Sequence, residues 1–168
     1  MSKAFLRESD LADEPVVPNP IAPLPPGAKN LLTTRGADRL RDELSRLTDI
    51  ERPPLAAQSA SDPDLKRDLQ VLDQRIRYLR ESLRTATIVD PPGHSDGVAR
   101  FGSTITVRDT QGELARYRIV GVDETDLEQG CISWLSPLAR ALVNARNGTS
   151  VSFSTPAGPS TLEVVAVD

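Results

Sequence analysis

Two aspartates flank a proline in the segment 58-QSASDPDLKRDL-69, which lies between two leucine-patterned segments. Asp62 and Asp64 could offer carboxylate oxygens to a hard cation such as Mg²⁺. They could instead begin a helix, since aspartate before proline is a favoured N-cap and Asp64 would complement the helix dipole in the first turn. Because two carboxylates two residues apart signal a metal only weakly, helix capping is the favoured interpretation.

Other catalytic signatures are missing from the sequence. His94 is the one histidine and Cys131 the one cysteine, which argues against a histidine-based triad, a zinc site and an internal disulfide. No phosphate-binding glycine loop occurs either. We therefore expect no metal site, no cofactor and no enzymatic activity of its own.

Arginines form a stripe in the segment 75-RIRYLRESLR-84. Arg77, Arg80 and Arg84 each follow an apolar position by one residue, so they would share one face of a helix. That face could meet a phosphate backbone or an acidic surface. A solvated face with cations near a helix C-terminus is the plainer interpretation.

Two leucine-patterned segments must position these side chains. The first, 33–50, repeats its leucines at spacings of four and three, and the second repeats with a period of 3.5. So narrow an apolar seam predicts an antiparallel coiled-coil hairpin over 31–88. Pro53 and Pro54 would end or kink its first helix, and local rules leave open whether that helix continues. The second seam comprises Leu65, Leu69, Leu72, Ile76, Leu79 and Leu83.

The hydrophobic period changes to that of strands after a Pro/Gly-rich linker at 89–98. Ser136 and Pro137 have the residue types of a helix start, and Gly148 would close that helix. The segment 99–168 is therefore predicted to be an antiparallel sheet carrying one short helix, which makes the protein α+β. The predicted strands are 103–109, 115–123, 149–155 and 161–168.

The N-terminal segment and the overall charge restrict the class of protein. Residues 1–30 form a proline-rich, initially acidic tail, which we expect to be disordered. A net charge of −4 argues against coating nucleic acid by bulk charge. With one cysteine and no apolar run of about 20 residues, the chain is expected to be cytoplasmic, without membrane contact.

Several segments, in order, resemble the bacterial Gre family of transcript-cleavage and elongation factors, GreA and GreB, and the GreB-like branch in particular. The resemblance covers about 30–168 and leaves out the tail. The matching segments are 31-LLTTRGADRLRDELSRL-47, 51-ERP-53, 71-VLDQRIRYLRESL-83, 100-RFGSTITV-107, 117-YRIVGVDE-124, 132-ISWLSPLARAL-142 and 155-TPAG-158.

The resemblance implies a hairpin followed by an FKBP-like domain that docks at the rim of the RNA polymerase secondary channel. The protein would be a monomeric, DNA-binding type of transcription regulator whose hairpin approaches nascent RNA. The rim residues would be Trp134, Leu135, Ser136, Pro137 and Arg140, and the RNA-proximal ones Arg75, Arg77, Arg80 and Arg84.

One departure from the family pattern concerns the hairpin tip. Cleavage-competent members carry a motif close to D-L-S-E-N-A-E/D-Y, whose acidic pair helps hold a second Mg²⁺ in the polymerase active site, and this chain lacks it. Between 52-RP-53 and 76-IRYL-79 it has 22 residues, about a dozen fewer than usual, which shortens the arm by roughly 9 Å. The resemblance thus implies a regulator without efficient cleavage.

Two alternatives stay open. Asp62 and Asp64 could stand in for the missing motif and reach the polymerase Mg²⁺, which would make the protein a true cleavage factor. The hairpin could also serve as a protein-binding module with another target.

Overall fold

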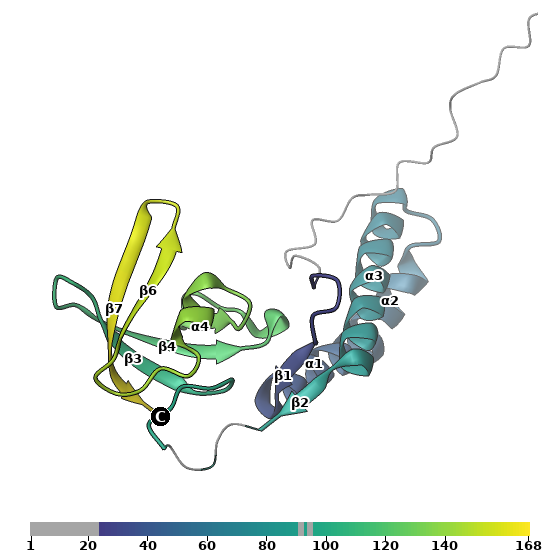
Figure 1. Ribbon diagram of the computed structural model, residues 1–168. Helices are drawn as coiled ribbons and strands as arrows, with labels where there is room; N and C mark the ends of the chain where they lie inside the picture. Colours follow the sequence, from purple (N-terminus) through teal and green to yellow (C-terminus); the bar gives the residue numbers. More distant parts are fainter. Residues whose placement is uncertain (1–23, 91–92, 94–95) are drawn as a thin grey trace, which may run out of the picture.

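The structure, a computed structural model, describes residues 24–90, 93 and 96–168 (Figure 1). The tail predicted to be disordered lies outside the described residues as far as residue 23, and so does His94. Figure 1 shows a helical part and a sheet part lying beside one another. None of the described helices has the length and hydropathy needed to cross a membrane.

Helices occupy both leucine-patterned segments. The first is made of α1 (Thr34–Ser45), η1 (Arg46–Glu51) and α2 (Arg52–Gln58), and the second is α3 (Pro63–Thr85). Both α1 and α2 contact α3. We call α1, η1, α2 and α3 together the arm; its coiled-coil character stays a prediction. Its buried apolar side chains lie toward the base, since α2 has none, and they pack with Leu32 just before α1: they are Ala37, Leu40, Leu47, Ile76 and Leu79.

The first helix continues through its two prolines by changing its winding. The segment η1 is a π-helix that ends at Glu51, and α2 begins at Arg52 with Pro53 and Pro54 in its first turn. Proline is tolerated there because the first N–H groups of a helix need no partner within it. A wider π-helical turn before the prolines thus carries the chain on to the tip.

The sheet has five strands in the order β5-β4-β3-β7-β6. The prediction of a purely antiparallel sheet is wrong, because β5 pairs parallel to β4 and makes the sheet mixed. At three residues, β5 is too short to give a periodic signal, and only the path of the chain through η2 (Val122–Glu124) sets its direction. The strands are β3 (Thr104–Arg108), β4 (Leu114–Val120), β5 (Cys131–Ser133), β6 (Ser150–Thr155) and β7 (Gly158–Val167).

The short helix α4 (Pro137–Leu142) packs against β5 and β6. Its predicted cap is confirmed: the Ser136 hydroxyl accepts a hydrogen bond from the N–H of Ala139 at 3.1 Å. The helix ends before the predicted Gly148, because Val143 has an extended ψ of 131° and leaves the helical path. Asn144 follows with a left-handed φ of 68°, which asparagine tolerates. Core side chains shared with the sheet include Ile105, Val107, Ile119, Ile132, Leu142 and Val164.

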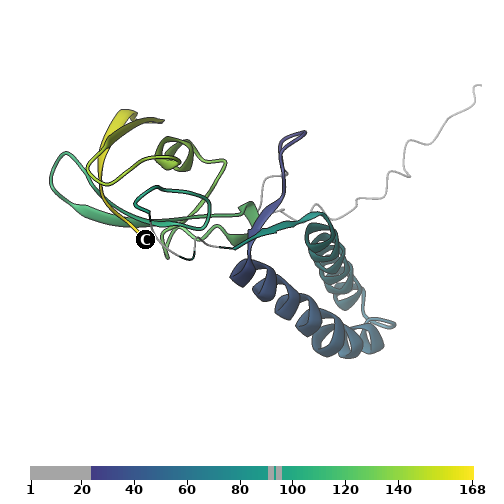
Figure 2. The same ribbon diagram turned by 60° about the horizontal axis from the view of Figure 1, so that its bottom comes forward.

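A two-stranded parallel ribbon joins the arm to the sheet. Its strands β1 (Leu31–Thr33) and β2 (Thr87–Val89) immediately precede α1 and follow α3. The ribbon contacts η2 and β4, and the rotated view in Figure 2 shows it between the helices and the sheet. The orientation of the arm therefore depends on contacts around Thr33 and η2.

Candidate functional site

The tip of the arm is built around a helix cap. Asp62 is the N-cap of α3, and its Oδ1 accepts hydrogen bonds from the N–H groups of Asp64 at 2.9 Å and Leu65 at 3.4 Å. Pro63 occupies the first position of the helix, and Asp64 lies exposed in its first turn. Across the described residues, no three His, Cys, Asp or Glu side chains come together in a group that could hold a metal.

Some arginines of the stripe on α3 form ion pairs and others are exposed without a partner among the described residues. Arg75 binds Glu43 of α1 through two hydrogen bonds of 2.8 and 3.0 Å, which raise the pKa of Arg75. Arg84 binds Glu81 one turn earlier on the same helix. Arg77 and Arg80 are exposed and make no hydrogen bond or ion pair with other described residues. The open part of the stripe is thus limited to these two side chains.

The predicted rim residues lie where the chain leaves β5 and enters α4. Trp134 is half-buried against the sheet core, and Leu135 and Ser136 are also partly covered. Pro137 and Arg140 are exposed on α4. Within this group, they are the side chains most accessible to a partner.

A buried carboxylate at the junction of arm and sheet was not singled out by the sequence. Glu124, only 4% exposed, accepts hydrogen bonds from the N–H of Thr33 at 2.8 Å and the N–H of Gly121 at 3.0 Å. It also accepts one from the Thr33 hydroxyl. That hydroxyl accepts in turn from the N–H of Gly36 at 3.0 Å and so caps α1. One carboxylate thus connects η2 to the start of the arm.

The neighbouring carboxylate ties η2 to the other helix of the arm. Asp123 accepts hydrogen bonds from the hydroxyls of Tyr78 and Ser82, both on α3. Partial burial, and then the hydrogen bond to Asp123, raise the pKa of the Tyr78 phenol well above its usual value. Asn30 also contacts this part of α3, since its Nδ2 donates a hydrogen bond to the Ser82 carbonyl at 3.0 Å.

Glycine is required where the junction packs most closely. A Cβ at Gly36 would overlap the carboxylate end of Glu124, and one at Gly121 would overlap the carbonyl oxygen of Leu31. Both glycines belong to quoted segments, RGADRL and RIVGVDE, but they are separated by most of the chain. The local sequence signal of this site is therefore a strand end followed by Gly-x-x-Glu. This motif does not indicate that its partner is the distant start of α1.

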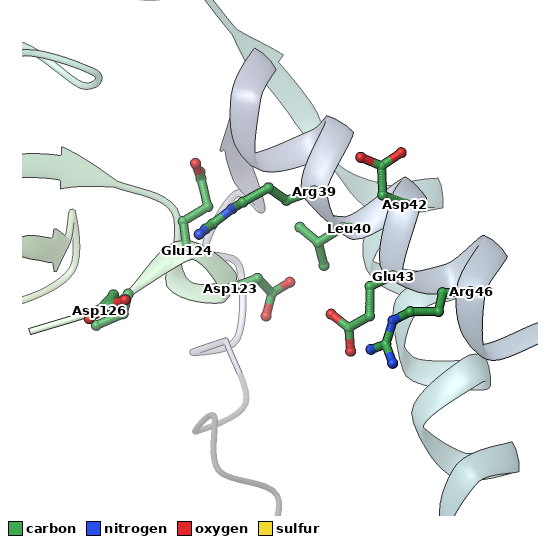
Figure 3. Close-up of a pocket in the computed structure, with 9 residues that line it drawn as sticks. Arg39, Leu40, Asp42, Glu43, Arg46, Asp123, Glu124 and Asp126 are labelled. Carbon is green, nitrogen blue, oxygen red and sulfur yellow. The ribbon is translucent and has the colours of Figure 1, made fainter. Parts of the chain in front are cut away.

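A groove of about 520 Å³ opens beside the junction, between the first helix of the arm and η2 (Figure 3). Figure 3 shows Glu43 and Arg46 on the arm side and Asp123 and Asp126 on the other. Most of its charged groups already have partners: Glu43 binds Arg75, and Arg46 binds Glu51. The groove is polar and mixed in charge, with no arrangement suited to catalysis. It is lined by Arg39, Leu40, Asp42, Glu43, Arg46, Asp123, Glu124, Thr125 and Asp126.

These features define a class: a helical arm carried on a small α+β domain and fixed to it by one buried and one half-buried carboxylate. The model of the family "Transcription elongation factor, GreA/GreB, C-term" matches residues 94–168. GreB of Neisseria meningitidis serogroup B (strain MC58) is 36% identical over 153 residues, which cover 83% of this chain and 94% of that protein. GreA of Alkalilimnicola ehrlichii is 35% identical over 150 residues, covering 81% and 95%. The chain belongs to the GreA/GreB family of transcription elongation factors.

Two solved structures are also similar to this chain. GreA factor homolog 1 (Gfh1) of Thermus thermophilus is 26% identical, with a TM-score of 0.40, over 84% of this chain and 99% of that one. A GreA/GreB factor from Nitrosomonas europaea is 23% identical, with a TM-score of 0.40, over 83% and 98%. The names of the sequence relatives refer to transcription elongation and give no support to DNA binding by this chain.

Proposed function

We propose that this protein binds RNA polymerase at the secondary channel and modulates elongation or initiation without efficient transcript cleavage. It acts on the polymerase as a monomeric cytoplasmic factor and is not itself an enzyme. Membership of the GreA/GreB family supports the choice of partner. The observation that carries the rest is the tip, where Asp62 is used as a helix cap.

The geometry of the tip disfavours metal delivery. A carboxylate ligand of Mg²⁺ must lie near 2.1 Å from the ion with tightly constrained geometry. The Oδ1 of Asp62 already accepts two backbone hydrogen bonds, and Asp64 would then be the remaining carboxylate at the end of the arm. The shortened arm thus carries one free carboxylate at its tip. We therefore do not expect the tip to hold the Mg²⁺ of the polymerase active site or to promote cleavage.

The arm is long and narrow enough to enter a channel. With 23 residues, α3 is roughly 35 Å long. Arg77 and Arg80 lie exposed along it and could meet the phosphates of nascent RNA. We propose that the arm alters access to the channel by occupying it, while these two arginines supply the electrostatic contact with RNA.

The docking surface is assigned to the start of α4. Pro137 and Arg140 are exposed there, and the capped start of the helix holds Pro137 in a fixed position. A charged side chain at Pro137 would have to be desolvated in a protein interface, which is costly without a partner. Replacement of this residue should therefore weaken binding to the polymerase.

Co-purification with RNA polymerase core tests the partner. The wild type should bind, and Pro137→Glu should weaken binding by about tenfold or more, the effect of losing a central contact. Pro156→Glu, at an exposed proline in the turn between β6 and β7, is the matched control and should bind normally. Failure of the wild type to bind would contradict the proposal and favour a protein-binding module with another target.

An assay of RNA 3′-end cleavage in a backtracked elongation complex tests the proposal that the protein does not promote efficient cleavage. The protein should bind the complex without raising cleavage above the level of the polymerase alone. Strong cleavage with the wild type that disappears in Asp62→Asn/Asp64→Asn would establish the alternative, an active cleavage factor whose tip carboxylates reach the catalytic Mg²⁺.

A further inference from the structure

A second, smaller cavity of about 50 Å³ lies between the start of α1 and the strands β4 and β5. Three arginines line it: Arg35 and Arg39 from α1, and Arg118 from β4. None of the three forms an ion pair with a described carboxylate. This is an unusual concentration of open positive charge in a chain whose net charge is −4.

The carboxylates near the three arginines are already engaged. Glu124 lines the cavity, but its oxygens accept hydrogen bonds from Thr33 and Gly121. Asp123 and Asp126 line the neighbouring groove, which Arg39 also lines (Figure 3). Asp123 is bound by Tyr78 and Ser82. The uncharged residues around the cavity are Thr33, Val120, Gln129 and Cys131.

Two further observations indicate that the cavity favours an anion. The Nε of Arg118 is buried and has no hydrogen-bond partner among the described residues, a costly state for a guanidinium donor. The first turn of α1 contains Arg35 and no acidic residue. A cation is unfavourable at that end of a helix, where the dipole is positive. An anion in the cavity would offset both costs.

We propose that this cavity binds a phosphate-class oxyanion, either free phosphate or the terminal phosphate of a nucleotide. One water molecule needs about 10–15 Å³ by the same measure of volume, so the cavity holds a group of only a few non-hydrogen atoms. Guanidinium groups present paired N–H donors that match phosphate oxygens. Because α1 belongs to the arm and β4 to the sheet, the bound oxyanion holds the two parts together. This proposal does not depend on polymerase binding.

Cys131 provides a built-in probe of the site. It is the one cysteine of the chain, it lines the cavity and it is half-buried. Compared with their rates toward a free thiol, a methanethiosulfonate reagent with a sulfonate group should therefore be favoured at Cys131 over one with a trimethylammonium group. Arg35→Gln, Arg39→Gln and Arg118→Gln should each lower the ratio of the two rates about threefold, the effect of one unit charge a few ångströms away.

Binding is tested on the full chain with inorganic phosphate and with ATP, against chloride at equal ionic strength. Phosphate at millimolar concentration should raise the Tm and slow the reaction of Cys131 with neutral methyl methanethiosulfonate several-fold. Protection by ATP as well identifies a terminal phosphate as the ligand, whereas protection by inorganic phosphate alone identifies the free ion.

Matched variants keep the test decisive. Arg116→Gln removes a cation from the same strand, and Arg41→Gln one from the same helix, but neither residue lines the cavity. Both should keep phosphate protection, while Arg35→Gln and Arg118→Gln lose it. Arg35 is exposed, so its variant remains informative if Arg118→Gln unfolds. Equal protection by phosphate and chloride, or equal loss in the Arg116→Gln control, would overturn the proposal.

Discussion

Two pairs of neighbouring acidic residues in this protein have different structural roles. Asp62 and Asp64 lie exposed at the tip of the arm, and the hydrogen bonds of Asp62 go to backbone N–H groups two and three residues ahead. Asp123 and Glu124 lie at the junction, where Glu124 binds Thr33, 91 residues away in the sequence, and Asp123 binds Ser82, 41 residues away. The first pair starts a helix, whereas the second fixes the helical arm to the sheet.

The difference lies in burial and in the number of donors that each carboxylate satisfies. Glu124 satisfies two backbone N–H groups and one hydroxyl inside the protein, where an unmatched donor costs far more than it does in water. Asp62 satisfies N–H groups that water would otherwise reach. Substitution should therefore cost much more at the junction than at the tip, and four predictions test this.

Glu124→Ala should have the largest effect. It leaves the N–H groups of Thr33 and Gly121 and the Thr33 hydroxyl without their acceptor. We expect the free energy of unfolding to fall by about 3–4 kcal/mol, from roughly 1–3 kcal/mol for each stranded buried donor after partial relaxation. Urea denaturation measures the change. Glu128→Ala, at an exposed glutamate in the segment between η2 and β5, should change it by no more than about 0.5 kcal/mol. Equal effects of the two substitutions would contradict the proposed role of Glu124.

Gly36→Ala should be the next most damaging change. Whether it lowers or raises the free energy of unfolding should depend on Glu124. Alanine normally stabilises a helix interior by up to about 1 kcal/mol relative to glycine. Here its Cβ would overlap the Glu124 carboxylate, so we expect a loss of about 2 kcal/mol, as for an overpacked core.

The double variant Gly36→Ala/Glu124→Ala separates the overlap from other effects. With the Glu124 carboxylate removed, the substitution at Gly36 should become neutral or stabilising, which urea denaturation of all four proteins in the cycle would report. A loss of stability that is the same in both backgrounds would mean that the overlap is not its cause.

Asp62→Ala should cost about 1 kcal/mol, the usual value of an N-cap. Asp62→Asn should be nearly neutral, because asparagine caps a helix equally well. The urea midpoints of the two variants measure this difference. If Asp62→Asn were as damaging as Asp62→Ala, the negative charge rather than the cap would matter at the tip.

The smallest effect is a loss of stability at alkaline pH through Tyr78. Its pKa is raised in the folded protein, so the unfolded chain releases the phenolic proton first, near the ordinary value of 10. The stabilisation is therefore fully present below pH 10 and is lost as the pH rises toward the folded-state pKa. Comparing urea midpoints of the wild type and Tyr78→Phe between pH 8 and 11 should show their difference shrinking, and a constant difference would contradict the assignment.

Local patterns predicted much of the architecture. The leucine spacings located both helical segments, Asp62 and Ser136 marked helix starts, and the change of period marked the sheet. The predictions failed for β5 and the ribbon of β1 and β2, because three-residue strands carry no periodic signal. The metal-binding and rim residues stay predictions, since their roles depend on a partner.

The sequence by itself determined the helices, most of the strands and the cap at Asp62, because each follows from residues a few positions apart. Only the tertiary structure decided that Glu124 would meet Thr33 and Gly36, and that Arg118 would come beside two arginines of α1. The physical reason is that hydrogen bonds and charges act through space. The partners of Glu124 and Arg118 therefore become neighbours only when the arm packs on the sheet.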